Sequence, residues 1–156
     1  MVHNSVNNLI FIQDNIKDKL NIANFPTVIA VSKKFRISEI IPLINHGHKH
    51  FGENQVQEAL EKWTDIKNDF QDIKLHMVGK LQTNKVKYAV NIFDFIHSLD
   101  NYKLAEKISS EQIKIGKKIK IFIQVNIGNE TQKNGIDIEN LEKFHKDCVS
   151  NLDLDI

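Results

Sequence analysis

A lysine pair directly follows the first apolar run of the chain. Lys33 and Lys34 come after Thr27–Ser32 (TVIAVS), a β-branched run that is typical of a buried strand. The core then holds the stem of Lys33 and leaves its amine at the end of the strand. Partial burial and the neighbouring ammonium of Lys34 both favour a neutral amine, which is the form that attacks an aldehyde. The pattern indicates a nucleophilic amine at Lys33, with solvated loop lysines as the alternative reading.

Polar residues also follow the four later apolar runs. They are Glu53 and Asn54, then Gly79, Gln82 and Asn84, then Ser98 and Asp100, and finally Asn126 and Gly128. In a parallel barrel the carboxyl ends of the strands gather at one face, where binding and catalytic sites are built. We therefore expect a site at this face, with Lys33 on one side of it.

The elements that position these residues alternate between strand and helix patterns. The predicted strands are Thr27–Ser32, His48–Gly52, Lys74–Val78, Asp94–Ser98 and Lys118–Asn126. The predicted helices are Val6–Leu20, Ser38–Asn45, Asn54–Trp63, Asn84–Val90, Asn101–Ile115 and a last one with an apolar stripe from Leu141 to Leu152. This order predicts one α/β domain over residues 1–156 with a parallel sheet. A (β/α) barrel and an open doubly wound sheet both fit, and the lack of a glycine-rich nucleotide motif after any strand disfavours the open sheet.

The composition argues against several classes of protein. The 156 residues carry a net charge of +1 with scattered basic residues, which gives no overall field for nucleic acid. The single cysteine, Cys148, excludes an internal disulfide framework and fits a reducing compartment. No apolar run approaches the roughly 20 residues that cross a bilayer, and the N-terminus lacks the pattern of a secretory signal. We expect a cytosolic protein without nucleic-acid or membrane partners.

Three histidines at alternate positions, His46, His48 and His50, raise the question of a metal site. Gly47 interrupts the run, so the three rings need not share one face of a strand. No cysteine or carboxylate cluster completes a ligand set. Cys148 falls on the apolar stripe of the last helix, which predicts a packed thiol. We therefore predict no metal site.

Five segments carry a family resemblance in the order and spacing of that family. They are VIAVSKK (28–34), HKHFGENQVQE (48–58), LHMVGKLQTNKVK (75–87), FIHSLDNYKLAEKI (95–108) and FIQVNIGNETQKNGID (122–137). With these segments the chain resembles the pyridoxal phosphate homeostasis protein family, single-domain proteins related to the N-terminal barrel of alanine racemase. The resemblance implies a TIM-type (β/α) barrel that binds pyridoxal 5′-phosphate (PLP). It also implies a Schiff base on the lysine of the SK motif, which is Lys33.

The resemblance implies further site residues. Asn54, the asparagine of FGEN, is expected near PLP, and the same residue is also a candidate N-cap for the following helix. His76 is expected to reach the barrel mouth, with a packed core histidine as the alternative. Lys133 is a candidate loop cation near the site, with a solvated loop lysine as the alternative.

Five predicted strands are fewer than the eight of a complete barrel. Leu152–Ile156 (LDLDI) has the pattern of the beginning of a sixth strand. The resemblance implies that the loops that hold the PLP phosphate follow later strands, outside these residues. We therefore expect an incomplete barrel of five βα units after an N-terminal helix. Unpaired edges and uncovered apolar surface predict that this chain alone is marginally stable, aggregates or self-associates, whereas complete family members are expected to be monomers.

Three functions follow from these observations. The first is a carrier that holds PLP reversibly on Lys33 and supplies it to PLP-dependent client enzymes, which requires no catalytic base. The second is a racemase-like enzyme, which requires a second base opposite Lys33. Tyr88 and Tyr102 are the available tyrosines, and neither directly follows a strand. The third is a chain that binds no PLP because it lacks the phosphate loops. We favour the carrier, without catalysis.

Overall fold

The computed structural model describes residues 3–20, 25–128, 132 and 134–156. Five parallel strands form the main sheet in the order of the sequence. They are β1 (Ala30–Val31), β2 (His50–Glu53), β3 (Lys74–Met77), β4 (Phe95–Leu99) and β5 (Lys120–Ile123). Because each strand lies beside the next and runs parallel to it, every connection crosses over through a helix. The carboxyl ends of all five strands therefore lie at one edge of the sheet.

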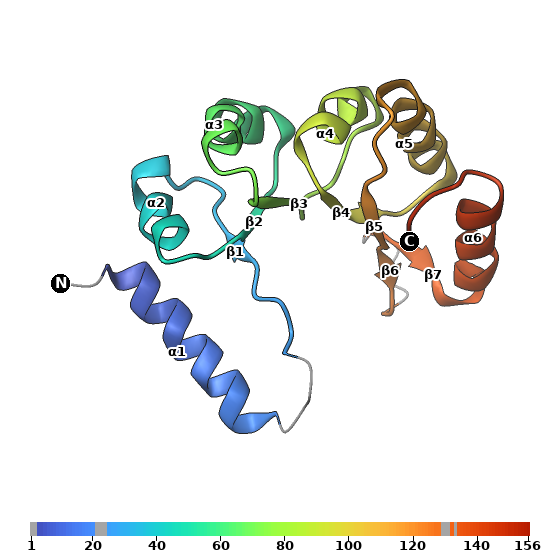
Figure 1. The fold of residues 1–156 in the computed structure, drawn as a ribbon. Coiled ribbons are helices and arrows are strands. Elements are labelled where there is room, and N and C mark those ends of the chain that lie inside the picture. The colour runs from blue at the N-terminus through green and yellow to red at the C-terminus, as the bar shows by residue number, and fades with distance from the viewer. Residues whose placement is uncertain (1–2, 21–24, 129–131, 133) are drawn as a thin grey trace.

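Helices follow each strand and cover one face of the sheet. They are α2 (Ile37–Asn45), α3 (Val56–Asp69), α4 (Val86–Ile92) after the 3₁₀ turn η1 (Thr83–Lys85), α5 (Tyr102–Ile115) and α6 (Ile138–Ser150). Figure 1 shows α2 to α5 along the outer side of an arc of strands, with α1 (Asn4–Lys19) against α2. This arrangement is an α/β fold and confirms the expected incomplete (β/α) barrel. None of the helices in the described residues is long and apolar enough to cross a membrane.

The core fills the space between the sheet and its helices. Alternate strand residues point toward the helices and are buried, and they include Phe51, Leu75, Met77, Ile96 and Ile121. The ring of Trp63 on α3 packs against Phe51, with ring centroids 4.9 Å apart. Both side chains are fully buried, so this contact fixes α3 onto β2 beneath the carboxyl edge.

A helix follows β2 as predicted, but both of its ends lie later than the predicted bounds Asn54–Trp63. The observed helix, α3, covers Val56–Asp69. Its start is later because β2 extends to Glu53 and the next two residues form the connection. Its end is later because Ile66 continues the apolar spacing and packs against the core.

The strand predicted at Lys118–Asn126 is divided into two. After β5, the residues of β6 (Val125–Asn126) pair with β7 (Ile136–Asp137) in a separate two-stranded sheet, which the sequence did not predict. Gln124 lies where the pairing changes. Its N–H donates to the carbonyl of Leu99 on β4 at 2.8 Å, and its carbonyl accepts from the first N–H of β7 at 2.8 Å.

The terminal residues Leu152–Ile156 begin to extend the main sheet, as the sequence predicted. Asp155 forms a parallel bridge with Lys120. The N–H of Ile121 donates to the carbonyl of Asp155 at 2.8 Å. These contacts place a sixth extended segment next to β5.

The inner face of the sheet, opposite the helices, is open. Val31 and Phe122 on this face are 47% and 51% exposed, and β1 pairs on one side only within the described residues. Because apolar faces and unpaired edges favour association, we expect self-association that increases with concentration in sedimentation velocity experiments. Phe122→Ser should weaken it more than Phe11→Ser, which changes an exposed residue on α1. A monomeric mass at every concentration, with a two-state thermal melt, would contradict this expectation.

Candidate functional site

The turn after β1 presents Lys33 at the carboxyl edge of the sheet. The N–H of Ser32 donates to the carbonyl of Gly52 at 2.9 Å, which continues the β1–β2 pairing by one residue. The N–H of Phe35 donates to the carbonyl of Ser32 at 3.1 Å and closes the turn over Lys33 and Lys34. The Lys33 side chain is exposed and has no hydrogen bond or ion pair with any residue that the structure describes. Its place after the first strand is as predicted, and its role in binding stays a prediction.

Glu53 ends β2 and points into the helix layer. Its Oε1 accepts hydrogen bonds from the hydroxyl of Ser32 at 2.7 Å, the ammonium of Lys62 at 2.9 Å and the indole N–H of Trp63 at 3.0 Å. The carboxylate is fully buried, so the donors to Oε1 and the charge of Lys62 compensate for part of its lost hydration. Its Oε2 has no hydrogen-bond partner among the described residues. Glu53 lies at the carboxyl end of its strand as expected, but its side chain points away from the barrel mouth. Alternate residues of a strand share a face, and Glu53 shares the helix side with Phe51.

Asn54 follows β2 and is half-buried at the carboxyl edge. The N-cap of α3 is Gln55, so the predicted capping role of Asn54 was wrong. Gly79 follows β3 and approaches Asn54 closely, because a Cβ built on Gly79 lies 2.3 Å from the carbonyl oxygen of Asn54. The two connections therefore touch at the level of the backbone. Beside them is a hollow of about 320 Å³, whose lining includes Asn54, Gln57, Met77, Lys80, Gln82 and Lys85.

His76 lies in β3 on the inner face of the sheet. Strand pairing aligns Val31 with Gly52 and Gly52 with His76. Lys33 and Asn54 come two residues later along their strands, so His76 lies deeper by about 7 Å in the strand direction. The structure thus brings Lys33 and Asn54 to one edge and places His76 one inward-facing layer below them.

His76 is the middle of a chain of three histidines on neighbouring strands. Its Nε2 is 2.9 Å from Nδ1 of His50, and its Nδ1 is 2.9 Å from Nε2 of His97. Its ring stacks on Phe95, with centroids 4.2 Å apart. Burial above all, and then the charges of His97 and His50, lower the pKa of His76 to about 4. Both ring nitrogens of this neutral side chain have partners, which fits the packed-histidine alternative. A contact with PLP stays a prediction.

Acid is expected to destabilise the fold through His76. A histidine with a lowered pKa in the folded state binds fewer protons than in the unfolded state. The stability that neutral His76 allows is therefore fully present above about pH 6.5. It is lost as the pH falls toward the pKa of about 4 in the folded state. Between pH 7 and pH 5 the free energy of unfolding should fall by about 2 kcal/mol from this group. Urea unfolding at a series of pH values measures this loss.

The matched variants are His76→Gln and His145→Gln. The first removes the buried titrating group, and the second removes an exposed histidine on α6. We expect His76→Gln to reduce the pH dependence of stability between pH 7 and pH 5, and His145→Gln to leave it as in the original chain. Part of the dependence should remain in His76→Gln, because burial also lowers the pKa of His48, His50 and His97. Equal pH dependence in all three proteins would show that His76 does not carry the effect.

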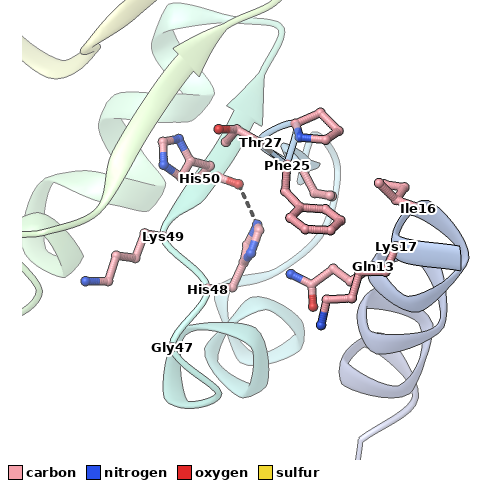
Figure 2. Close-up of a pocket in the computed structure, with 11 residues that line it drawn as sticks. Gln13, Ile16, Lys17, Phe25, Thr27, Gly47, His48, Lys49 and His50 are labelled. Atoms are coloured by element: carbon pink, nitrogen blue, oxygen red, sulfur yellow. Dashed lines mark hydrogen bonds between the residues drawn. The ribbon is translucent and has the colours of Figure 1, made fainter. Parts of the chain in front are cut away.

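A second hollow, of about 410 Å³, lies at the opposite end of the strands. Figure 2 shows Gln13 and Lys17 reaching from α1 toward His48, with Phe25 on another side of the space. Because His48 precedes β2 whereas Lys33 follows β1, this hollow lies at the amino ends of the strands. It is therefore separate from the edge that carries Lys33.

The sequence also raised two further questions: a metal site at His46, His48 and His50, and a loop cation at Lys133. The ring Nε2 of His48 hydrogen-bonds to the carbonyl of His50 at 2.8 Å. Within the described ranges, no group of three or more His, Cys, Asp and Glu side chains has the arrangement of a metal site. Lys133 lies outside the described residues.

Comparison with known families places this fold. The chain matches the family model described as alanine racemase, N-terminal domain, over residues 8–156. The chain belongs to this family. This family membership agrees with the parallel strand order and the crossover helices described above.

Several known proteins are similar to this chain at moderate sequence identity. The pyridoxal phosphate homeostasis protein of Buchnera aphidicola subsp. Schizaphis graminum is 36% identical over 148 residues, which cover 92% of this chain and 64% of the relative. PipY of Synechococcus elongatus PCC7942, solved without PLP, is 33% identical with a TM-score of 0.77, covering 95% of this chain and 64% of PipY. PipY with PLP bound is 34% identical with a TM-score of 0.73, covering 88% and 62%. This chain therefore spans slightly less than two thirds of the length of these relatives.

Proposed function

We propose that this chain binds PLP as a reversible Schiff base on Lys33 and takes part in intracellular PLP homeostasis. The observation that carries the proposal is the position of Lys33, an exposed and unpaired amine among the described residues, at the carboxyl end of β1. Support also comes from the similarity to PipY, which has been solved with PLP bound.

The residues at this edge fit the aldehyde end of PLP. Bound PLP would supply an aldehyde, and Nζ of Lys33 is the amine that would hold it reversibly, with water as the other product. Such reversible binding suits a carrier. Asn54, at the same edge, offers an amide that can hydrogen-bond to the bound ring or its phenolic oxygen. Both ring nitrogens of His76 hydrogen-bond to neighbouring histidines, so we propose that His76 stabilises the inner face of the sheet below PLP.

A carrier fits the described residues better than a racemase. Racemisation requires a second base on the opposite face of the substrate from Lys33. Tyr88 and Tyr102 both lie on helices, outside the strands. The hydroxyl of Tyr102 donates to the carboxylate of Asp147 on α6 at 2.8 Å, which directs it into the helix layer. We therefore propose transfer of PLP to client enzymes in the cytoplasm, without catalysis by this chain.

The experiment is a PLP titration followed by the visible absorbance of the Schiff base. We expect the band in the original chain and in Lys34→Ala, and its complete loss in Lys33→Ala. Lys34→Ala is the matched control because it changes the neighbouring exposed lysine of the same turn. A band of equal size in Lys33→Ala, or no band in any of the three proteins, would contradict the proposal. Conversion of one alanine enantiomer into the other would replace the carrier with an enzyme.

A further inference from the structure

A largely buried lysine side chain, that of Lys62, lies directly behind the turn that carries Lys33. The ammonium of Lys62 donates to the carbonyl of Ser32, to Oε1 of Glu53 and to Oε1 of Glu58, each at 2.9 Å. An ammonium has three N–H donors, so all of its donors are used. The Lys62 side chain is 9% exposed and Glu53 is fully buried, so this cation has one well-defined orientation.

Two of these acceptors reach the peptide groups on either side of Lys33. The carbonyl of Ser32 belongs to the peptide that precedes Lys33. Oε1 of Glu58, bonded to Lys62, also accepts the N–H of Lys34 at 2.7 Å, and this N–H belongs to the peptide that follows Lys33. Hydrogen bonding from Lys62, and then from the backbone of Lys34, lowers the pKa of Glu58 despite partial burial. The backbone of Lys33 is therefore held from behind while its amine stays free of described partners.

The backbone of this turn requires such support. Lys34 has a φ of 66°, in the left-handed region that costs a non-glycine residue about 1–2 kcal/mol. The hydrogen bond from its N–H to Glu58 offsets this cost in the folded state. Loss of the bond frees Lys34 to return to an ordinary conformation, which changes the direction in which Lys33 leaves the turn.

We infer that Lys62 is a positioning residue for Lys33. Together with Glu58 it fixes the two peptides that flank Lys33, and so aims the amine at the carboxyl edge of the barrel. The inference rests on the proposed function, because it assigns the orientation of the amine that binds PLP. It assigns Lys62 no contact with PLP.

The chain supplies a matched control for Lys62 on the same helix. Lys67 donates to Oδ2 of Asp94 at 2.7 Å and to the carbonyl of Ile92 at 3.0 Å. It also joins α3 to strand ends through a partly buried ion pair. Because Asp94 directly precedes β4, this pair lies at the amino ends of the strands, away from Lys33.

The experiment compares Lys62→Met with Lys67→Met by two readouts. The first is hydrogen exchange of the Lys34 amide without PLP, and the second is the rate at which the PLP absorbance band of Lys33 appears. We expect both variants to lose stability. We expect Lys62→Met alone to speed exchange of the Lys34 amide beyond the change in global stability, and to slow PLP attachment by about tenfold or more, as misplacement of a reacting group does.

Glu58→Gln is a milder variant in case Lys62→Met does not fold. It keeps the Lys62–Glu53 pair and weakens the acceptor that the Lys34 N–H shares with Lys62. We expect faster exchange of the Lys34 amide, whereas Glu61→Gln, an exposed change on the same helix, should leave it unchanged. If Lys34 exchange and PLP attachment in Lys62→Met match those in Lys67→Met, or if Glu58→Gln leaves Lys34 exchange unchanged, the inference is overturned. Loss of the proposed function is seen separately, as a band that persists in Lys33→Ala.

Discussion

Glu53→Leu is expected to lower the free energy of unfolding by about 3–5 kcal/mol, the range for breaking a buried ion pair. The substitution removes the acceptor shared by Ser32, Lys62 and Trp63, so a hydroxyl and an indole N–H lose a partner and the ammonium keeps only part of its compensation. Chemical denaturation followed by far-ultraviolet circular dichroism measures the change. The loss should be accompanied by faster exchange throughout the turn after β1.

Two comparisons separate burial from charge in this prediction. Asp72→Asn breaks the ion pair between Lys49 and Asp72, whose side chains are 54% and 61% exposed, and should change stability far less than Glu53→Leu does. The double variant Glu53→Leu/Lys62→Met removes both buried charges and should recover part of the loss. Equal losses for Glu53→Leu and Asp72→Asn would mean that burial of the pair has no energetic importance.

Gly79→Ala is expected to destabilise the fold by about 3 kcal/mol, the upper part of the range for overpacking. The added methyl group would lie 2.3 Å from the carbonyl oxygen of Asn54 and 2.8 Å from its Cα, and these are backbone atoms that cannot rotate away. The connection after β3 or the one after β2 therefore has to shift. Because Asn54 moves with the second of these, the affinity for PLP should fall together with the stability.

Gly52→Ala is the matched control. Its added methyl group would meet Cγ2 of Ile29 at 3.2 Å and Cγ2 of Val31 at 3.3 Å, which are ends of side chains on the open inner face. These atoms can move by a few tenths of an ångström, so the destabilisation should be below about 1 kcal/mol. If Gly52→Ala destabilises the chain as much as Gly79→Ala does, close packing against Asn54 is not the cause.

The sequence predicted those parts of the site that depend on local pattern. Thr27–Ser32 is an apolar run followed at once by Lys33, and this alone places the amine at a strand end. The helix at Asn101–Ile115 was also predicted closely, because both of its ends carry local markers. The Asn101 side chain accepts from the N–H of Leu104, and Gly116 adopts a φ of 64°.

The parts that depend on strand register could not be read from the sequence. His50, His76 and His97 come from three strands, and only the pairing of those strands brings their rings within 2.9 Å. In the sequence alone, His50 is visible only as a neighbour of His46 and His48. The orientation of the Glu53 side chain could not be predicted for the same reason. β2 extends one residue beyond the predicted strand, and this extension places Glu53 on the helix side of the sheet.

Lys62 was missed for a related reason. Within α3 it reads as an ordinary charged residue four positions after Glu58, a spacing that commonly forms a surface ion pair. Its third acceptor, the carbonyl of Ser32, is thirty residues away in the sequence and is known only once β1 and α3 are packed together. An unexplained acidic residue directly after an apolar strand, here Glu53, is the available indication that a buried cation is needed nearby.

The most direct test of the central claim is to identify the residue to which PLP attaches. Borohydride reduction of the protein mixed with PLP converts the Schiff base into a stable secondary amine, and peptide mass mapping then locates the added group. We predict a single modified residue, Lys33, with Lys34 and Lys62 unmodified at equimolar PLP. Attachment at Lys34 in place of Lys33, an even distribution over exposed lysines, or no attachment would contradict the account.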